Sequence, residues 1–267
     1  MAPFFRLASI AASLVSATMI AQNHASAIPA PILTPQSTTS ELAKTNDAAD
    51  AHLQYVDKRE YGVITSCKVP GTVAMTFDDG PYKFTNQLLD QLKDAGVKAT
   101  FFVNGHNIGD IYQYDWVVKR AYNEGHQIAS HTWSHADLTR LSYNQIHRQM
   151  VQLDNAIESI IGVKPVYMRP PFGYLNGVAQ RYLRDKGYKI VKWRVDTNDW
   201  AHPSNIDASL VAYKHSGGSG FIALEHDTLE STVNDLVPRA IQYAKNRGWE
   251  LVTVGECLGV HQDDWYR

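Results

Sequence analysis

The sequence lacks the features that mark nucleic-acid-binding and membrane-spanning proteins. Its 25 Lys and Arg residues are balanced by 27 Asp and Glu residues, and no block of basic residues stands out. Attraction to nucleic acid or to an anionic membrane needs concentrated positive charge, so we expect neither partner. No apolar run reaches the ~20 residues that cross a bilayer. The last residues, HQDDWYR, lack the apolar tail of a lipid-anchor signal, and no Asn-x-Ser/Thr sequon predicts N-glycosylation.

Cysteine is scarce as well, with Cys67 and Cys257 as the only two. In an oxidising compartment such a pair indicates a disulfide that joins the two ends of a domain. Closing so long a loop contributes at most about 4–5 kcal/mol in the chain-entropy model. The alternative is two unrelated buried thiols.

The N-terminal region predicts export. Residues 1–27 combine an early positive charge at Arg6, an apolar run through Ile20 and a small-x-small end, which is typical of a signal peptide cut after Ala27. The alternative is an amphipathic targeting segment. Residues 28–61 are rich in Pro, Ser, Thr and Ala and predict a flexible leader or pro-segment. We therefore expect one catalytic domain at 62–267, in a monomer that is secreted or associated with the cell wall.

Apolar runs alternate with helical patterns over the rest of the chain. A length of 267 residues and a hydrophobic content of 44% fit one α/β domain. The expected strands are 72–77, 99–103, 127–130, 166–169, 189–195, 220–224 and 250–254, and the expected helices are 85–95, 116–123, 143–161, 177–186, 206–214 and 233–247. Strand followed by helix, repeated, predicts a parallel (β/α) barrel of the TIM type, distorted or incomplete. A doubly wound open sheet is the alternative.

Two histidines and an acid pair suggest a metal centre. His131 and His135 are four residues apart, so on a helical turn both imidazoles would project from one face and suit a divalent metal. A carboxylate is needed as a third ligand. The best donor is the Asp78–Asp79 pair, because two adjacent acids at the end of an apolar strand are hard to explain by packing.

The acid pair also suggests a division of labour. Where the strand ends and the chain turns at Gly80, both carboxylates can reach one pocket from different angles. We expect Asp79 to be the metal ligand and Asp78 to be a base that takes a proton from water acidified by the metal. The alternative is that Asp79 caps the next helix.

Five motifs then fall in order at the ends of the expected strands: TFDDGP, HTWSH, RPPFG, DTNDW and LEHD. Together they resemble the motifs of the polysaccharide deacetylase family, the NodB-homology carbohydrate esterases of family 4. The segment between the cysteines resembles secreted fungal chitin deacetylases. The resemblance implies a distorted (β/α) barrel with a bound divalent ion, and hydrolysis of N-acetyl or O-acetyl groups on polysaccharides.

The resemblance also implies roles for single residues. It makes Asp79, His131 and His135 the metal ligands and Asp78 the base. Arg169 would hold and orient Asp78, and the backbone N–H of Phe172, where the family often has Tyr, would stabilise the oxyanion.

A second set of implied roles concerns the leaving group and the sugar. His226 would be the general acid, paired with Asp199. Trp200 and Leu224 match hydrophobic positions of the family's groove, with Leu224 beside the acetyl methyl group. The aromatic residues Tyr174 and Trp133 lie beside the same motifs and suit contact with sugar faces.

We therefore expect a metal-dependent chitin or chito-oligosaccharide deacetylase. Zn²⁺ is the expected ion, although Co²⁺, Mn²⁺ and Fe²⁺ accept the same ligands. Alternatives on the same scaffold are a peptidoglycan deacetylase and an acetylxylan esterase. Outside that class stand a two-histidine-one-carboxylate iron oxygenase and a non-catalytic secreted carbohydrate-binding protein. The oxygenase gives no role to the Asp78–Arg169 and Asp199–His226 pairs, and a binding protein would have no reason to keep Asp78 and His226.

Overall fold

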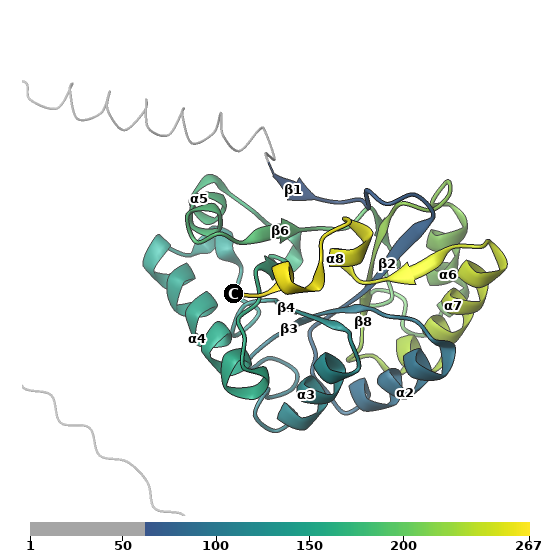
Figure 1. The fold of residues 1–267 in the computed structure, drawn as a ribbon, viewed down its shortest axis with the longest axis horizontal. Coiled ribbons are helices and arrows are strands. Elements are labelled where there is room, and N and C mark those ends of the chain that lie inside the picture. The colour runs from purple at the N-terminus through teal and green to yellow at the C-terminus, as the bar shows by residue number, and fades with distance from the viewer. Residues whose placement is uncertain (1–61) are drawn as a thin grey trace, which may run out of the picture. The chain divides into compact units, whose positions relative to one another are not determined.

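A single parallel sheet organises the protein. The computed structural model describes residues 62–267, so the predicted signal peptide and leader lie outside the described residues. All pairings between its nine named strands are parallel, in the order β1-β6-β5-β4-β3-β2-β8-β7, and β9 pairs with β2 (Figure 1). The strands are β1 (Val63–Ile64), β2 (Thr72–Asp78), β3 (Thr100–Val103), β4 (Gln127–Ser130), β5 (Tyr167–Met168), β6 (Lys189–Val191), β7 (Val195–Asp196), β8 (Ile222–His226) and β9 (Glu250–Val252).

The sheet curls into a distorted, open barrel. Strand β6 pairs with β5, and β7 pairs with β8, yet β6 and β7 are separated by only three residues, 192–194. The chain therefore passes within three residues from β6, which is next to the edge strand β1, to the opposite edge strand β7, and β6 and β7 are not paired with each other. The expected barrel is thus confirmed in its distorted form, whereas the expected single strand at 189–195 is divided by this bend.

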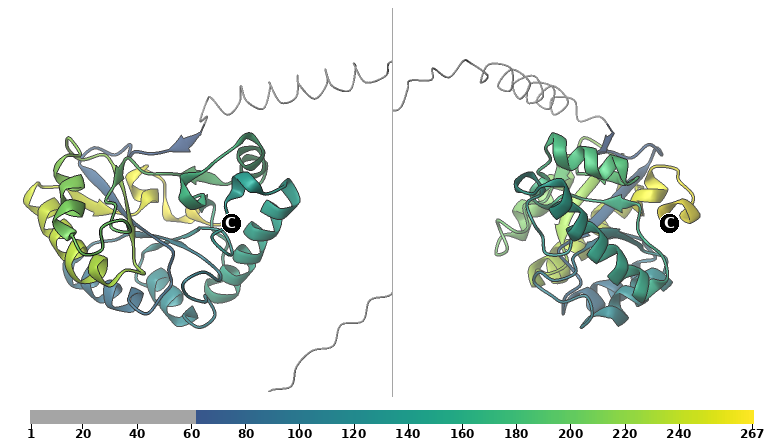
Figure 2. Two further views of the ribbon diagram at one scale, coloured as in Figure 1. Left: turned by 180° about the vertical axis from the view of Figure 1, so that it is seen from behind. Right: turned by 90° about the vertical axis from the view of Figure 1, so that its left-hand side faces the viewer.

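Helices surround the sheet on its outer side (Figures 1 and 2). They are α2 (Thr85–Ala95), α3 (Asp115–Asn123), α4 (Tyr143–Ile161), α5 (Gly177–Asp185), α6 (Ile206–Lys214), α7 (Val237–Asn246) and α8 (Val254–Cys257), with short turns η1 (Leu138–Arg140), η2 (Pro171–Gly173), η3 (Thr232–Leu236) and η4 (Gln262–Trp265). The apolar positions of α2, such as Leu88 and Leu92, are fully buried against strand residues that include Phe77 and Phe101. This packing holds α2 against the outer side of the sheet.

The C-terminal segment covers the end of the sheet where the strands begin. The N–H of Val254 donates to Thr100 Oγ1 at 2.8 Å, and the N–H of Gly255 donates to Gln127 Oε1 at 2.9 Å. Thr100 and Gln127 are the first residues of β3 and β4. Helix α8 therefore closes the amino-terminal end and leaves the carboxyl-terminal end for a site.

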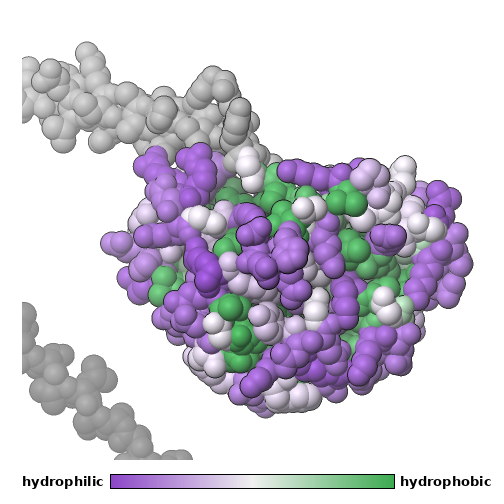
Figure 3. Space-filling view, in the orientation of Figure 1, coloured by the Kyte–Doolittle hydropathy of each residue, from purple (hydrophilic) through white to green (hydrophobic). Residues whose placement is uncertain are grey.

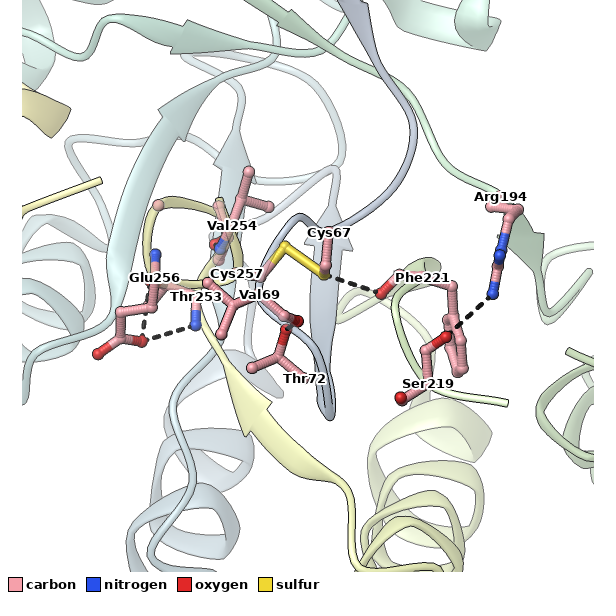
Figure 4. Close-up of a disulfide and its surroundings, with 12 residues drawn as sticks. Cys67, Val69, Thr72, Arg194, Ser219, Phe221, Thr253, Val254, Glu256 and Cys257 are labelled. Carbon is pink, nitrogen blue, oxygen red and sulfur yellow. Dashed lines mark hydrogen bonds between the residues drawn. A yellow bond between two sulfur atoms is a disulfide. The ribbon is translucent and has the colours of Figure 1, made fainter. Parts of the chain in front are cut away.

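The two cysteines form the expected disulfide. Cys67 and Cys257 are bonded, with their Cα atoms 4.9 Å apart and a sequence separation of 190 (Figure 4). The same figure shows Thr253 and Glu256 beside the bridge, where Glu256 Oε2 accepts from the Thr253 N–H at 2.9 Å and caps α8. The bridge thus joins the start of the described domain to its last helix.

Several predicted elements differ in their bounds. The expected helix 233–247 is two elements, since a π-helical turn, η3, precedes α7. The expected strand 220–224 begins and ends two residues later, as β8. Asp79 does not cap α2, because Phe84 occupies the N-cap position.

The surface is mainly hydrophilic on the face shown in Figure 3, with small apolar patches between charged residues. Within residues 62–267, no helix is long and apolar enough to cross a membrane.

Candidate functional site

The carboxyl-terminal ends of five strands meet around one groove. The residues at or just beyond these ends are Asp78, His131, Arg169, Asp196 and His226. Parallel strands place such ends on one side of a barrel. The groove has a volume of about 450 Å³. Its lining comprises Asp78, Asp79, Ile108, His131, His135, Phe172, Tyr174, Trp193, Asp196, Trp200, Leu224, His226, Thr228 and Leu229.

The two neighbouring aspartates face different partners. Asp79 has a φ of 75°, in the left-handed region that non-glycine residues rarely adopt, so the chain turns sharply between the two side chains. Asp78 is 3% exposed, and its Oδ1 accepts a 2.6 Å hydrogen bond from Arg169 Nη1. The more exposed Asp79 turns towards the histidines. The two carboxylates therefore face different partners, Arg169 for Asp78 and the two histidines for Asp79.

Asp79, His131 and His135 form a cluster with the geometry of a metal site. Their potential ligand atoms all lie within 4.8 Å of one another. Asp79 Oδ1 is 3.4 Å from His135 Nε2 and 3.8 Å from His131 Nε2. His131 Nδ1 lies 2.8 Å from the carbonyl oxygen of Arg169, which can only accept, so Nδ1 is the donor. In the neutral ring this leaves the Nε2 lone pair facing carboxylate oxygens, an arrangement that a divalent cation would satisfy.

The two histidines converge by a route that the sequence did not reveal. The expected helical turn is wrong, because residues 131–137 form a loop in which Thr132 and His135 have φ values of 70° and 52°. These left-handed positions bring the rings together, with centroids 5.0 Å apart. Burial, with a contribution from His131, lowers the pKa of His135, which favours the neutral form that binds metals.

Asparagines that the sequence analysis did not single out as site residues support this cluster. Asn104 Nδ2 donates to the carbonyls of His131 at 2.6 Å and Thr132 at 2.8 Å. Asn107 Nδ2 donates to Asp79 Oδ1 at 3.1 Å. Their position directly after β3 is the signal that would have found them, since that strand ends at the same groove.

His226 and Asp199 form a second, independent pair. Asp199 is fully buried, and its Oδ1 lies 2.8 Å from His226 Nδ1. Its other oxygen accepts from the His226 N–H at 2.8 Å and from Thr232 Oγ1 at 2.7 Å. Burial lowers the pKa of His226, but the hydrogen bond and charge of Asp199 outweigh it and raise the pKa to about 9.

Arg169 is enclosed by aromatic rings. It is 0% exposed, with its guanidinium 4.1 Å from the Phe102 ring centroid and 5.5 Å from that of Trp193. Its Nη2 donates to the Lys192 carbonyl at 3.2 Å. Burial lowers the pKa of Arg169, and the adjacent Asp78 carboxylate opposes that shift. A buried arginine needs such a partner, and the burial of both side chains means that this is not a surface ion pair.

Exposed aromatic side chains line the groove, whereas one predicted aromatic does not. Trp200 is 59% exposed, Tyr174 is 56% exposed and Phe172 is 55% exposed, while Leu224 is buried at the groove floor. Trp133 instead packs against Gly105, where a Cβ would lie 2.5 Å from its Cδ2. Trp133 is therefore half-buried against the core and does not line the groove.

Phe172 lies beside the histidine cluster in a left-handed backbone conformation. Phe172 has a φ of 60° within η2, and its ring packs edge-on against His135 at 4.6 Å between centroids. Among residues 62–267, the backbone hydrogen bonds that join different elements, turns and loops include none donated by the Phe172 N–H.

Comparison with known proteins gives consistent results. The family model for polysaccharide deacetylase matches residues 65–191. The chain is 47% identical over 207 residues to a chitin deacetylase of Pestalotiopsis sp, a match that covers 77% of this chain and 70% of that protein. It is 44% identical over 211 residues to a probable peptidoglycan-N-acetylglucosamine deacetylase of Arthroderma benhamiae, covering 77% of this chain and 48% of that longer protein.

A solved structure agrees with the fold. The chitin deacetylase from Colletotrichum lindemuthianum superposes with a TM-score of 0.74 at 39% identity, covering 77% of this chain and 95% of that one.

Proposed function

Because the chain belongs to the polysaccharide deacetylase family, we propose that it hydrolyses the N-acetyl groups of chitin or chito-oligosaccharides. The products are acetate and a glucosamine unit. The observation that carries the proposal is that one groove holds three metal-ligating side chains together with two charge-paired groups, Asp78–Arg169 and His226–Asp199. An oxygenase or a binding protein has no use for both pairs.

Asp79, His131 and His135 would hold the divalent ion, for which zinc is the proposed choice. Bound there, the ion would act as a Lewis acid that polarises the acetyl carbonyl and acidifies water. The hydrogen bond from His131 Nδ1 to the Arg169 carbonyl fixes the ring so that Nε2 faces the site.

Asp78 is the proposed base. It takes a proton from the attacking water, whose oxygen forms a bond to the acetyl carbon. Arg169 anchors one carboxylate oxygen at 2.6 Å and leaves the other, Oδ2, facing the cluster, 3.6 Å from His131 Nε2. The base is thereby oriented before substrate arrives.

His226 is the proposed acid. As the carbon–nitrogen bond breaks, His226 Nε2 donates a proton to the leaving amine, because an unprotonated amine leaves poorly. Asp199 holds the ring through Nδ1 and favours its protonated form. The Phe172 N–H is the proposed donor to the developing oxyanion, and losing one such donor typically raises the barrier by about 2.7–4 kcal/mol.

The groove walls fit a sugar substrate. The exposed rings of Trp200 and Tyr174 offer apolar faces for pyranose rings, and the buried Leu224 offers a surface for the acetyl methyl group. We also propose that residues 1–27 act as a signal peptide and direct export of the protein.

A substrate panel tests the choice of polymer. Equal acetyl concentrations of chitotetraose, acetylated xylan and peptidoglycan fragments are compared by the acetate they release. The proposal predicts the highest kcat/KM for chitotetraose. A higher kcat/KM for peptidoglycan fragments would contradict this choice and would favour the activity named for the similar Arthroderma benhamiae protein.

A further inference from the structure

Asp227, the residue after His226, is a buried carboxylate with no place in the mechanism above. It lies just beyond β8 and is 1% exposed. Its Oδ2 accepts a 2.5 Å hydrogen bond from Thr85 Oγ1, and Thr85 Oγ1 in turn accepts from the Tyr82 N–H at 2.9 Å. Its Oδ1 has no hydrogen-bond partner among residues 62–267.

The carboxylate packs directly on Gly80, the residue after Asp79. A Cβ added at Gly80 would lie 2.6 Å from Asp227 Oδ1 and 2.8 Å from its Cγ, too close for any side chain. Gly80 has no positive φ, so its backbone conformation alone does not require glycine. The close approach of the Asp227 carboxylate is what favours glycine at position 80. On its other side, the carbonyl of Gly80 accepts from the Asn104 N–H at 2.8 Å.

The surroundings of Asp227 give no stability reason for a carboxylate there. A cavity of only about 10 Å³ lies beneath it, lined by Pro81, Thr85 and otherwise apolar side chains. Burying a polar group with one oxygen unpaired is unfavourable in such a place, where an apolar residue would serve as well. A core would normally place an apolar residue at this position. Here the position holds Asp227, whose carboxylate contacts Gly80 in the turn that follows Asp78 and Asp79.

We propose that Asp227 is a positioning residue that fixes the turn carrying Asp78 and Asp79 against the strand end carrying His226. Each neighbour is one residue away: Gly80 follows Asp79, and Asp227 follows His226. Strands β2 and β8 already pair Asp78 with His226, and the contact between Gly80 and Asp227 extends this alignment beyond the strand ends, where Asp79 faces the histidines. This role rests on the proposed function.

The first test compares Asp227→Ala and Asp227→Asn with a matched control, Asp154→Ala. Asp154 is also a buried carboxylate, 3% exposed, but it bonds Tyr188 and Arg267 and does not line the groove. Each variant is assayed for acetate release from chitotetraose, acetate release from 4-nitrophenyl acetate, zinc affinity by chelator competition, and thermal stability.

Asp227→Ala should lower kcat on the amide and weaken zinc binding by about tenfold or more, as losses of outer supporting groups do. The loss on the activated ester should be smaller, since that leaving group needs no proton from His226. Asp227→Asn keeps the shape of the side chain and an acceptor for Thr85, so it should retain most of the wild-type kcat on the amide and most of the zinc affinity. Asp154→Ala should lower the thermal stability and leave the amide kcat and the zinc affinity unchanged.

A double-mutant cycle with Gly80→Ala makes the test sharper. The added methyl group would occupy the space of the Asp227 carboxylate, so Gly80→Ala alone should harm zinc binding and turnover. In the double variant with Asp227→Ala that space is free, and the combined loss should be clearly smaller than the product of the two single losses. If the loss in the double variant equals the product of the two single losses, the proposal is overturned.

The proposal is also overturned if Asp227→Ala matches Asp154→Ala in zinc affinity and amide kcat. Failure of the proposed function looks different: wild-type protein would release no acetate from any polymer. In that case the zinc affinities of the same variants still decide whether Asp227 positions the Asp79 turn.

Discussion

At the scale of single residues, Asp78 and Asp79 carry the sharpest distinction. They are adjacent, yet Asp78 is anchored to Arg169 and Asp79 faces the histidines. Asp78→Asn should therefore reduce acetate release by about 10²- to 10⁴-fold while zinc stays bound, since Asp78 is the proposed base and is not one of the three metal-ligating side chains. His131→Ala should lose both activity and zinc. Activity assays paired with metal analysis check this, and equal zinc content in the two variants would contradict the assignment.

His226 should matter most where the leaving group is poor. His226→Ala is expected to lower the rate on an amide far more than on an activated acetyl ester, because only the amine needs a donated proton. The ratio of the two rates, measured on the same enzyme sample, is the readout. Equal losses on both substrates would remove His226 from the acid role.

The Asp199–His226 pair predicts a pH effect. A general acid must be protonated, and the raised pKa of about 9 keeps His226 protonated in neutral solution. The rate should thus fall as pH rises through the His226 pKa. The positive charge of a bound ion would offset the contributions of Asp78 and Asp79 to that shift, but not the contribution of Asp199.

Asp199→Asn removes the carboxylate charge, so the His226 pKa should drop and the alkaline limb of kcat should move to lower pH. Complete pH profiles of wild type and variant measure the shift. An alkaline limb that stays in place would show that another group controls it.

Residue types and their positions suggested Asp78, Asp79, His131 and His135, and the family resemblance supplied the other candidate site residues. The arrangement of these residues in space could not be predicted from the sequence. The convergence of His131 and His135 depends on left-handed backbone at Thr132 and His135, which no glycine signals. The contact of Asp227 with Gly80 joins residues 147 positions apart, and only the folded chain shows it.

At the scale of elements, helix α4 shows local prediction at its best. Its bounds match the expected 143–161, because Ser142 and Gln145 form the predicted capping box, with Gln145 Oε1 2.9 Å from both the N–H and Oγ of Ser142. Gly162 ends the helix with a φ of 83°, as expected of a glycine stop.

Ser142→Ala should lower the free energy of unfolding by about 1 kcal/mol without changing kcat, because α4 lies outside the groove lining. Urea unfolding and acetate assays on the same preparation check both parts. A change in kcat with stability unaltered would contradict this purely local role.

Other elements depend on partners far away in the chain. β1 has two residues and exists only through pairing with β6. The division of 189–195 into β6 and β7 reflects pairing with β5 and β8, which a run of apolar residues does not encode. Tertiary pairing, rather than local propensity, sets these boundaries.

At the scale of the whole molecule, the disulfide connects the first and last parts of the described domain. Replacing Cys67 and Cys257 together by Ser should lower the free energy of unfolding by up to about 4–5 kcal/mol. The groove lies at the other end of the strands, so the rate of the remaining folded protein should be unchanged. Urea unfolding of the variant, with reduced wild type as control, measures the loss. Equal stability of oxidised and reduced wild type would contradict this role.

The α/β alternation predicted the barrel class, since each strand–helix repeat returns the chain to the same end of the sheet. The alternation alone did not exclude an open sheet, because the same strand–helix repeat builds both doubly wound sheets and barrels. The bend at 192–194 is the local feature that makes the barrel distorted.

The most direct test of the central claim is metal-dependent acetate release from N-acetylglucosamine oligomers. Purified protein is assayed as isolated, after removal of metal by a chelator, and after zinc is added back. We predict acetate release that is lost with the metal and restored by zinc. Acetate release that persists after verified metal removal, or none from zinc-loaded protein, would contradict the proposed metal-dependent deacetylase.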